Sequence, residues 1–143
     1  MKKATAQPLV NGWLKDVGLK VTEPRQAILK LLISANEPLS AKGIFDALPK
    51  PARANQATVY RNLENLQSTG LIRQVNFQHD HNHYELAIDH HHHAICQSCG
   101  MVVDIASCDI TSLETQVKNV SGFVTINSHA LEFFGICRNC DKK

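Results

Sequence analysis

The chain has 143 residues, of which 43% are hydrophobic and 20% are charged. This balance supports a folded core and excludes an intrinsically disordered chain. No apolar run approaches the ~20 residues of a membrane-spanning helix, and residues 1–5 lack the apolar segment of a signal peptide. We therefore expect a cytoplasmic protein of one large or two small domains, with no membrane partner.

The net charge of +2 conceals an uneven distribution. Residues 1–78 carry 11 Lys and Arg against five Asp and Glu, whereas residues 79–143 carry four against eight. All eight histidines also lie in the second part. A basic part without histidine suits a polyanion such as nucleic acid, and an acidic, histidine-rich part suits cations.

The first part of the chain predicts helices followed by a β-hairpin. Helices are expected over residues 9–17, 24–34, 40–48 and 55–69, from the spacing of apolar residues and from residues typical of helix ends. Strands are expected over residues 71–75 and 84–88, with a polar turn over residues 79–83. The first of these helices is the weakest, and the last three followed by the hairpin outline a winged helix-turn-helix.

The second part predicts a small α/β unit. Strands are expected over residues 94–96, 101–105, 123–126 and 130–136, with one amphipathic helix over residues 110–120. A metal and a partner subunit would supply the stabilisation that so small a core lacks. The expected class is α+β, with a winged-helix DNA-binding domain over residues 1–88 and an α/β dimerisation and metal-binding domain over residues 89–143.

Two Cys-x-x-Cys pairs lie in the second part, Cys96 with Cys99 and Cys137 with Cys140. A tight turn lets both sulfurs of a pair face one ion, and four thiolates complete a tetrahedral zinc site without an open position. We therefore predict a structural zinc whose binding energy is part of the folding energy. Two separate redox dithiols are the alternative. Cys108 stands outside both pairs and is interpreted as a buried or spare thiol.

Four further residues form a candidate regulatory metal site: Glu85, His91, His93 and Asp104. His91 and His93 alternate, so both face one side of an extended segment. Imidazole and carboxylate ligands suit Fe²⁺, Mn²⁺ or Zn²⁺, and they hold an ion less permanently than four thiolates. That is what a sensor requires, whereas the alternative is a solvated polar strand.

The remaining histidines are candidates for a further metal site or for adventitious binding. His90 and His92 face the side opposite to that of the regulatory candidates, and His129 could join them. The others, His79, His81 and His83, lie in the predicted hairpin turn, where histidines are more often solvated than bound to metal.

The helix expected over residues 55–69 has the character of a DNA-recognition helix. Arg61 can contact a phosphate or a guanine edge, and the Tyr60 ring can pack on a thymine methyl group. Thr58 projects to the same side. The cations that could hold the flanking DNA backbone are Lys20, Arg25, Arg53 and Arg73. An ordinary solvated helix face is the alternative interpretation.

Four segments of the chain resemble the ferric uptake regulator (Fur) family of metal-dependent transcriptional repressors. They are residues 18–25, residues 57–63, the histidine run that leads into residues 96–100, and residues 135–140. The resemblance covers nearly the whole chain and implies a homodimer whose winged helices bind palindromic operator DNA. It implies zinc on the four paired cysteines and Fe²⁺ or Mn²⁺ at the hinge, on the four regulatory candidates. It also implies that Tyr60 and Arg61 touch the operator and that Lys20 reaches the minor groove.

The chain departs from the family pattern in places that bear on the metal. Many members carry a further regulatory-site histidine just before the helix that begins near Ser40, where this chain has Glu37. Glu37 or a histidine of the hairpin turn could substitute for it. The usual third-site glutamate aligns near Thr111, with Glu114 one turn further on. Zinc-sensing relatives often have cysteine at the position of Glu85, and peroxide-responsive relatives usually have aspartate there. Glu85 therefore favours iron or manganese as the regulatory metal. The zinc-sensing and peroxide-responsive branches of the family are the alternatives.

Two other function classes match parts of the sequence. His83 and Glu85 before the first Cys-x-x-Cys formally resemble the zinc-deaminase motif, but the spacing is too short. A metal buffer would leave the basic first part without a role. We therefore expect neither catalytic residues nor a small-molecule substrate. The expected function is a repressor in which a regulatory metal sets the spacing of two DNA-binding domains.

Overall fold

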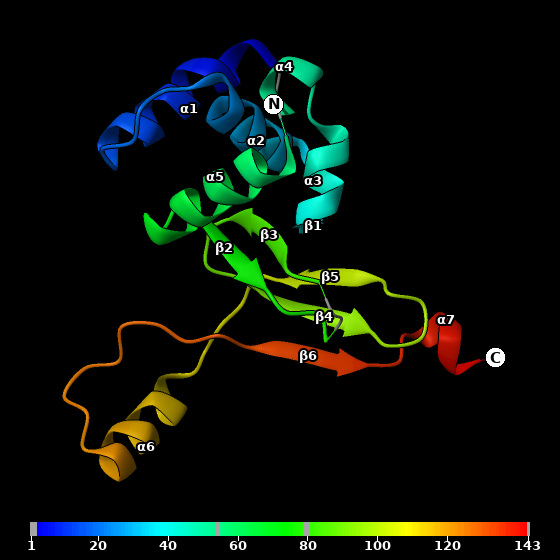
Figure 1. Ribbon diagram of the computed structural model, residues 1–143. Coiled ribbons are helices and arrows are strands. Elements are labelled where there is room, and N and C mark those ends of the chain that lie inside the picture. The colour runs from blue at the N-terminus through cyan, green and yellow to red at the C-terminus, as the bar shows by residue number, and fades with distance from the viewer. Residues whose placement is uncertain (1–2, 54, 79–80, 143) are drawn as a thin grey trace. The chain divides into compact units, whose positions relative to one another are not determined.

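The computed structural model describes residues 3–53, 55–78 and 81–142. The chain divides into two compact units, Met1–Asp89 and His90–Lys143 (Figure 1). Each unit contains its own three-stranded sheet. No helix in the described part of the chain is both long and apolar enough to cross a membrane.

The first unit is built from helices and a small sheet, whose first strand lies between the second and third helices and whose other two strands follow the last helix. The helices are α1 (Lys3–Asp16), α2 (Glu23–Ser34), α3 (Ala41–Ala47), α4 (Lys50–Arg53) and α5 (Gln56–Ser68). The strands are β1 (Leu39–Ser40), β2 (Ile72–Val75) and β3 (His83–Leu86), in the order β1-β3-β2 with antiparallel pairing. Helices α3 and α5 followed by the β2–β3 hairpin form a winged helix-turn-helix, which confirms the predicted fold class.

Local sequence signals place the ends of α5. The Asn55 side chain caps the helix by accepting a hydrogen bond from the Thr58 backbone N–H at 2.8 Å. Gly70, with φ of +78°, follows the C-cap residue in the left-handed conformation that glycine adopts at little cost. Between these ends Val59, Leu63 and Leu66 recur at helical spacing and are fully buried.

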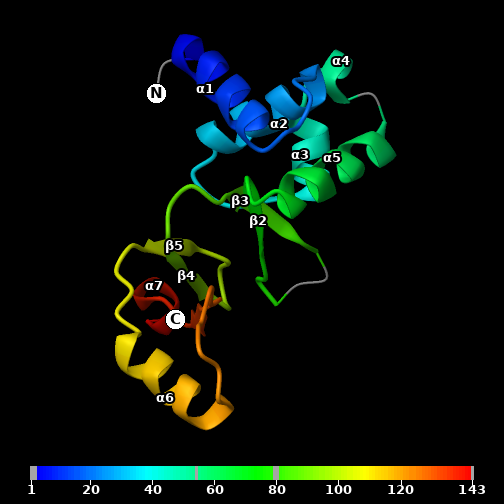
Figure 2. The same ribbon diagram turned by 90° about the vertical axis from the view of Figure 1, so that its left-hand side faces the viewer.

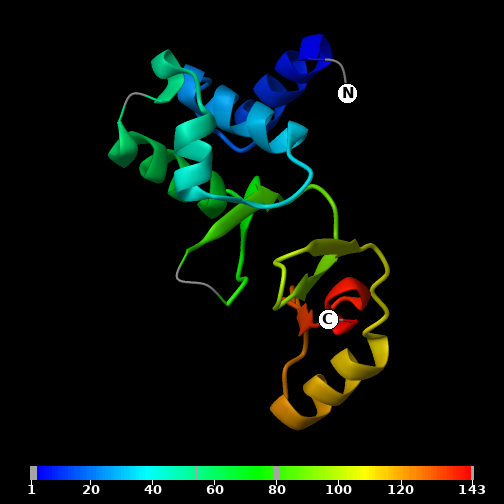
Figure 3. The same ribbon diagram turned by 90° about the vertical axis from the view of Figure 1, so that its right-hand side faces the viewer.

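The buried stripe of α5 belongs to a single hydrophobic core. The core also contains Ile28, Leu29 and Ile44 from the preceding helices and Ile72 from β2. Figures 1 and 3 show α2, α3 and α5 gathered around this core, on one side of the small sheet. The opposite side of α5 is therefore left exposed.

Helix α4 was not predicted: its residues fall between the helices expected over residues 40–48 and 55–69, next to Pro49 and Pro51. Proline lacks a backbone N–H, but the first turn of a helix does not need that donor. Pro51 lies within that first turn, and Ala52 is buried. The two prolines therefore start a short helix rather than only ending one.

The second unit has β4 (His92–Cys96) at the centre of its sheet. β5 (Val102–Ile105) pairs with β4 antiparallel, and β6 (Glu132–Gly135) pairs with it parallel on the other edge. Helix α6 (Thr111–Ser121) connects β5 to β6, and α7 (Arg138–Asp141) ends the unit. Figures 1 and 2 show α6 standing away from the strands, and none of its residues is buried.

The strand predicted over residues 123–126 is wrong. Helix α6 ends at Gly122, which has φ of +74°, and no strand is assigned over residues 122–131. Phe123 and Val124 have the composition of a strand, but their side chains are 62% and 89% exposed. A strand requires a hydrogen-bonding partner and a covered face, and this segment has no strand beside it in the described part of the unit.

The core position of Leu63 makes it a sharp test of the first unit. We expect Leu63→Ala to lower the free energy of unfolding by about 2–5 kcal/mol, because it leaves a cavity in a fully buried site. Chemical denaturation followed by helical circular dichroism measures this change. The exposed neighbour Gln67→Ala is the control and should change stability by less than about 0.5 kcal/mol. Equal stabilities of the two variants would contradict the packing.

Candidate metal centres and DNA-binding surface

The paired cysteines come together because β4 and β6 pair in parallel. β4 ends at Cys96, which lies opposite Gly135, the last residue of β6. A tight turn follows each strand: Gly100 N–H donates to the Cys96 carbonyl at 2.9 Å, and Cys140 N–H donates to the Cys137 carbonyl at 3.0 Å. Both turns therefore lie at the same end of the sheet, where Figures 1 and 3 show α7.

The sulfur positions fit a tetrahedral ion. The four Sγ atoms lie within 4.8 Å of one another, and Cys99 Sγ is 3.8 Å from Cys137 Sγ. Four thiolates at the usual Zn–S distance of ~2.3 Å are about 3.8 Å apart in a tetrahedron. Donor type and spacing therefore suit a four-coordinate zinc with no open position, which is the character of a structural site.

Backbone groups favour a thiolate at one of the four cysteines. The Cys137 N–H, which points at Cys96 Sγ from 3.4 Å, and the Cys99 N–H lower the pKa of Cys96 to about 6. At Cys140 a Ser98 hydrogen bond lowers the pKa, but the Cys137 thiol, burial and the other two thiols raise it to about 11. Four adjacent thiolates therefore require a cation to neutralise them.

A second group of donors lies at the start of β4. The rings of His91 and His93 have centroids 4.9 Å apart, and strand pairing places Asp104 opposite His93. His93 Nε2 lies 3.8 Å from Asp104 Oδ1. His93 is 2% exposed, whereas the Asp104 side chain is 60% exposed. These three predicted ligands are thus neighbours, and the carboxylate gives the group a side that is open to solvent.

Glu85, the other predicted regulatory ligand, lies on β3 in the first unit. It accepts a hydrogen bond from Arg73 Nε at 2.5 Å, from the residue directly opposite on β2. The Glu85 side chain is only 12% exposed, so this ion pair compensates its charge. Arg73, which was expected to hold the DNA backbone, is therefore engaged with Glu85.

A third group contains three of the remaining candidate histidines and one residue that the sequence analysis did not assign to a site. The donor atoms of His90, His92, His129 and Cys108 all lie within 4.8 Å of one another. Cys108 had been interpreted as a spare thiol, because a lone cysteine has no spacing partner in the sequence. Only the fold brings its loop beside the two histidine segments.

The other candidate ligands lie in the first unit. Glu37 is exposed in the turn after α2. In the hairpin, His83 Nδ1 lies 3.2 Å from the His81 carbonyl oxygen, and the His83 ring packs against Phe77 with centroids 4.6 Å apart. His79 falls outside the described residues. Within the described part of the first unit, Glu37, His81 and His83 join no group of three or more donors.

The outer side of α5 carries the residues predicted to read DNA. Tyr60 is 40% exposed, Arg61 is exposed and Thr58 is partly buried. The helix is 13 residues long, or about 20 Å, which is long enough to lie along a major groove ~12 Å wide. An aromatic ring and a guanidinium on the exposed side of a capped helix can contact base edges and phosphates.

The flanking cations differ in how they are held. Lys20 is exposed in the loop after α1, and its carbonyl oxygen accepts a hydrogen bond from Arg25 Nη1 at 2.9 Å. Arg25 Nε also donates to Asn62 Oδ1 at 3.2 Å, which ties the start of α2 to α5. The Arg53 guanidinium packs over the Phe45 ring, 5.2 Å from its centroid. Arg25 and Arg53 therefore support the winged helix itself.

A winged helix-turn-helix joined to a unit rich in imidazole, thiolate and carboxylate donors is the architecture of a metal-dependent transcriptional regulator. The chain belongs to the ferric uptake regulator family, whose family model matches residues 16–134.

Individual relatives agree with this membership. The chain is similar to the peroxide operon regulator of Bacillus subtilis, with 33% identity over 131 residues that cover 91% of this chain and 90% of that protein. It also resembles the structure of the ferric uptake regulator from Pseudomonas aeruginosa with manganese, with a TM-score of 0.73, 31% identity, and coverage of 91% and 98%. The ferric uptake regulator from Francisella tularensis with iron gives a TM-score of 0.69, 32% identity, and coverage of 87% and 96%.

The four-cysteine group predicts a specific loss on substitution. We expect Cys99→Ser to lose one tightly held zinc per chain and to destabilise the second unit, because three thiolates no longer close the tetrahedron. Zinc analysis after dialysis against a chelator, with thermal unfolding, measures both effects. Arg138→Ala, at an exposed position between the second pair of cysteines, should keep its zinc. Full zinc retention by Cys99→Ser would show that the four sulfurs do not share one ion.

Proposed function

We propose that the chain is a metal-responsive transcriptional repressor that binds palindromic operator DNA as a homodimer. The observation that supports this most directly is the contrast between two groups of donors in one small unit. The four cysteine sulfurs lie within 4.8 Å of one another, whereas His93 lies beside His91 and 3.8 Å from the solvent-exposed carboxylate of Asp104. The first suits a permanent ion and the second an exchangeable one, which is the combination a metal sensor needs.

The regulatory metal is proposed to be Fe²⁺ or Mn²⁺, with Zn²⁺ reserved for the four cysteines. Imidazole and carboxylate donors without a thiolate suit these harder ions. Relatives whose structures contain manganese and iron support the same choice. From the sequence resemblance we also propose Glu85 as a ligand, in exchange for its ion pair with Arg73. That exchange would make metal binding affect the first unit as well.

The homodimer is supported by apolar side chains that the second unit leaves exposed. Val117, Val120 and Phe133 are 40%, 90% and 50% exposed, and other exposed apolar residues of this unit include Met101, Val103, Leu113, Phe123, Val124 and Ile136. So many exposed apolar residues in so small a unit are typical of a surface that a protein partner covers. A second copy of the chain is the partner that a palindromic operator requires.

Regulation would then follow from linked equilibria. Two recognition helices of a dimer must be spaced by about 34 Å to enter successive major grooves on one side of the duplex. Binding of the regulatory metal favours the arrangement of the two DNA-binding units that has this spacing. The free energy of operator binding becomes more favourable by the coupling free energy between the metal site and the DNA-binding surface. Repression follows because the bound dimer blocks transcription.

A second candidate is a peroxide-responsive repressor, and similarity to the peroxide operon regulator of Bacillus subtilis favours it. In that case an oxygen atom would be added to an imidazole of the regulatory group when Fe²⁺ is bound and peroxide is supplied. Mass spectrometry of peptides containing His91 and His93, from Fe²⁺-loaded and Mn²⁺-loaded protein, distinguishes the two candidates. Oxidation confined to the Fe²⁺ sample, with release of DNA, would favour peroxide sensing.

Metal dependence of DNA binding is the central test. A duplex is first selected from a random pool with Mn²⁺-loaded protein, and its affinity is then measured with and without Mn²⁺ or Fe²⁺ while the four-cysteine zinc is retained. We expect the metal to raise affinity by about 5- to 150-fold, the usual range of allosteric coupling. His91→Ala should lose most of this increase, because His91 supplies a donor that no neighbour replaces.

The control for that experiment is Gln97→Ala, at an exposed position beyond the end of β4. It should respond to metal as the unchanged chain does. Identical affinity with and without metal, or failure of any sequence to be enriched, would contradict the proposed repressor.

Arg61 should contribute directly to operator binding. We expect Arg61→Ala to weaken binding by about 1–3 kcal/mol if it reads a base edge, with relaxed specificity at that base pair. If Arg61 contacts a phosphate, the logarithmic salt slope should fall by about 1 instead. Fluorescence anisotropy at several salt concentrations separates these results. Gln67→Ala, at the other end of α5, is the control, and unchanged affinity and slope for Arg61→Ala would remove Arg61 from the interface.

A further inference from the structure

The third group of donors gathers residues from three separate segments of the second unit. His92 lies on β4 and is 4% exposed, with His90 just before it. Cys108 lies in the loop between β5 and α6, and His129 lies in the segment between α6 and β6. A buried imidazole beside a thiol and two further imidazoles is an unusual concentration of metal-ligand atoms.

Three of these atoms form a nearly equilateral triangle. Cys108 Sγ lies 3.1 Å from His92 Nε2 and 3.3 Å from His129 Nε2, and the two nitrogens are 3.2 Å apart. The His90 ring lies 4.8 Å from the His92 ring and 4.7 Å from the His129 ring, centroid to centroid. In a tetrahedral zinc site with Zn–N of ~2.0–2.1 Å and Zn–S of ~2.3 Å, neighbouring ligand atoms lie about 3.3–3.6 Å apart. The three distances between Cys108, His92 and His129 are close to this range.

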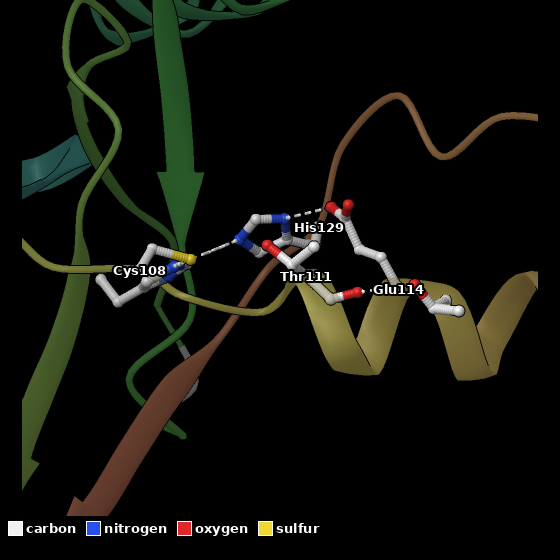
Figure 4. Close-up of polar contacts among 6 residues, drawn as sticks. Cys108, Thr111, Glu114 and His129 are labelled. Atoms are coloured by element: carbon white, nitrogen blue, oxygen red, sulfur yellow. Dashed lines mark hydrogen bonds and ion pairs between the residues drawn. The ribbon is translucent and has the colours of Figure 1, made fainter.

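A carboxylate lies near one of the imidazoles, beside one of its ring nitrogens. Glu114 Oε1 lies 3.9 Å from His129 Nδ1, the nitrogen that does not face Cys108. Figure 4 shows His129 between Cys108 on one side and Glu114 on the other. A carboxylate at the second nitrogen of a ligating histidine holds the ring in place and makes it a better donor. Glu114 therefore has the position of a supporting residue rather than of a ligand.

Thr111 lies at the position where the family usually supplies a glutamate ligand, and its neutral hydroxyl does not replace a carboxylate. Its carbonyl oxygen accepts a hydrogen bond from Thr115 Oγ1 within α6. The donor set is thus three imidazoles and one thiol rather than imidazoles and a carboxylate. Replacement of a carboxylate oxygen by sulfur shifts preference from harder ions such as Mn²⁺ toward Zn²⁺.

We propose that Cys108 completes a second, closed zinc site with His90, His92 and His129. Four protein ligands leave no open position, so the site holds its ion permanently and does not serve as the exchangeable sensor. It joins both ends of α6 to β4, through Cys108 before the helix and His129 after it. Since α6 has no buried residue, zinc supplies an attachment to the sheet that packing does not provide. This proposal stands independently of the repressor function.

Cobalt substitution tests the thiolate ligand directly. Co²⁺ is titrated into the full chain with its four-cysteine zinc already bound, and the near-ultraviolet sulfur-to-cobalt charge-transfer band is recorded. We expect a band of about one quarter of the intensity given by a four-cysteine cobalt site, because one thiolate replaces four. Cys108→Ser should lose this band while it keeps the four-cysteine zinc. Thr111→Ala should keep the band, since Thr111 is not a ligand.

Zinc stoichiometry provides an independent readout. After dialysis of the zinc-loaded chain against a chelator, we expect two zinc ions per unchanged chain and one per Cys108→Ser chain. Absence of the cobalt band in the unchanged chain, its persistence in Cys108→Ser, or one zinc in both proteins would overturn the proposal. If Cys108→Ser fails to fold, the cobalt band and the zinc count of the unchanged chain still test whether the proposed site exists. Operator binding is not used here, so failure of this site is distinguishable from failure of the repressor function.

Discussion

The parallel pairing of β4 with β6 is the constraint on which the metal chemistry depends. It places Cys96 opposite Gly135, so that the turns after both strands end at one point. The same register fixes which side of the sheet each histidine before Cys96 faces. A slip of one residue would exchange the two sides and separate the sulfur pairs. The β4–β6 pairing therefore brings the two cysteine pairs together, and the β4–β5 pairing places Asp104 opposite His93.

Alternation along the start of β4 separates two chemistries that would otherwise compete. His93 lies beside His91 and near the Asp104 carboxylate, whereas His90 and His92 lie near the Cys108 thiol. Four consecutive imidazoles would compete for a single ion if the segment were a loop. In an extended segment they point alternately to two sides, because the side-chain period is two, so the two proposed sites would differ in their donors and metal preference.

The sequence was informative where a site is marked by local spacing. Two Cys-x-x-Cys pairs, the alternation of His91 with His93, and the helical spacing of Val59 and Leu63 each carry their meaning within a few residues. Cys108 has no such marker, because its partners come from β4 and from the segment before β6. The strand expected over residues 123–126 was wrong for a related reason: apolar, β-branched composition indicates a strand only where another strand is available to pair.

The electrostatic contacts also escaped prediction. Arg53 and Arg73 were expected at the DNA backbone because they are cations in a basic domain, yet one packs on Phe45 and the other pairs with Glu85. Charge composition tells which part of a chain attracts a polyanion. It does not tell which cations the fold has already engaged, since that depends on neighbours far away in the sequence.

The two units differ in what holds them together, and this difference bears on where the proposed metal response would arise. The first unit has a hydrophobic core with fully buried side chains from four helices and the sheet, so its fold does not need a metal. In the described part of the second unit, only His92, His93, Ile95 and Cys96 are buried. So small an apolar core is typical of a unit that bound ions or a partner would stabilise. On the proposed function, metal occupancy would therefore affect the second unit more than the first, whose core includes the buried side of α5.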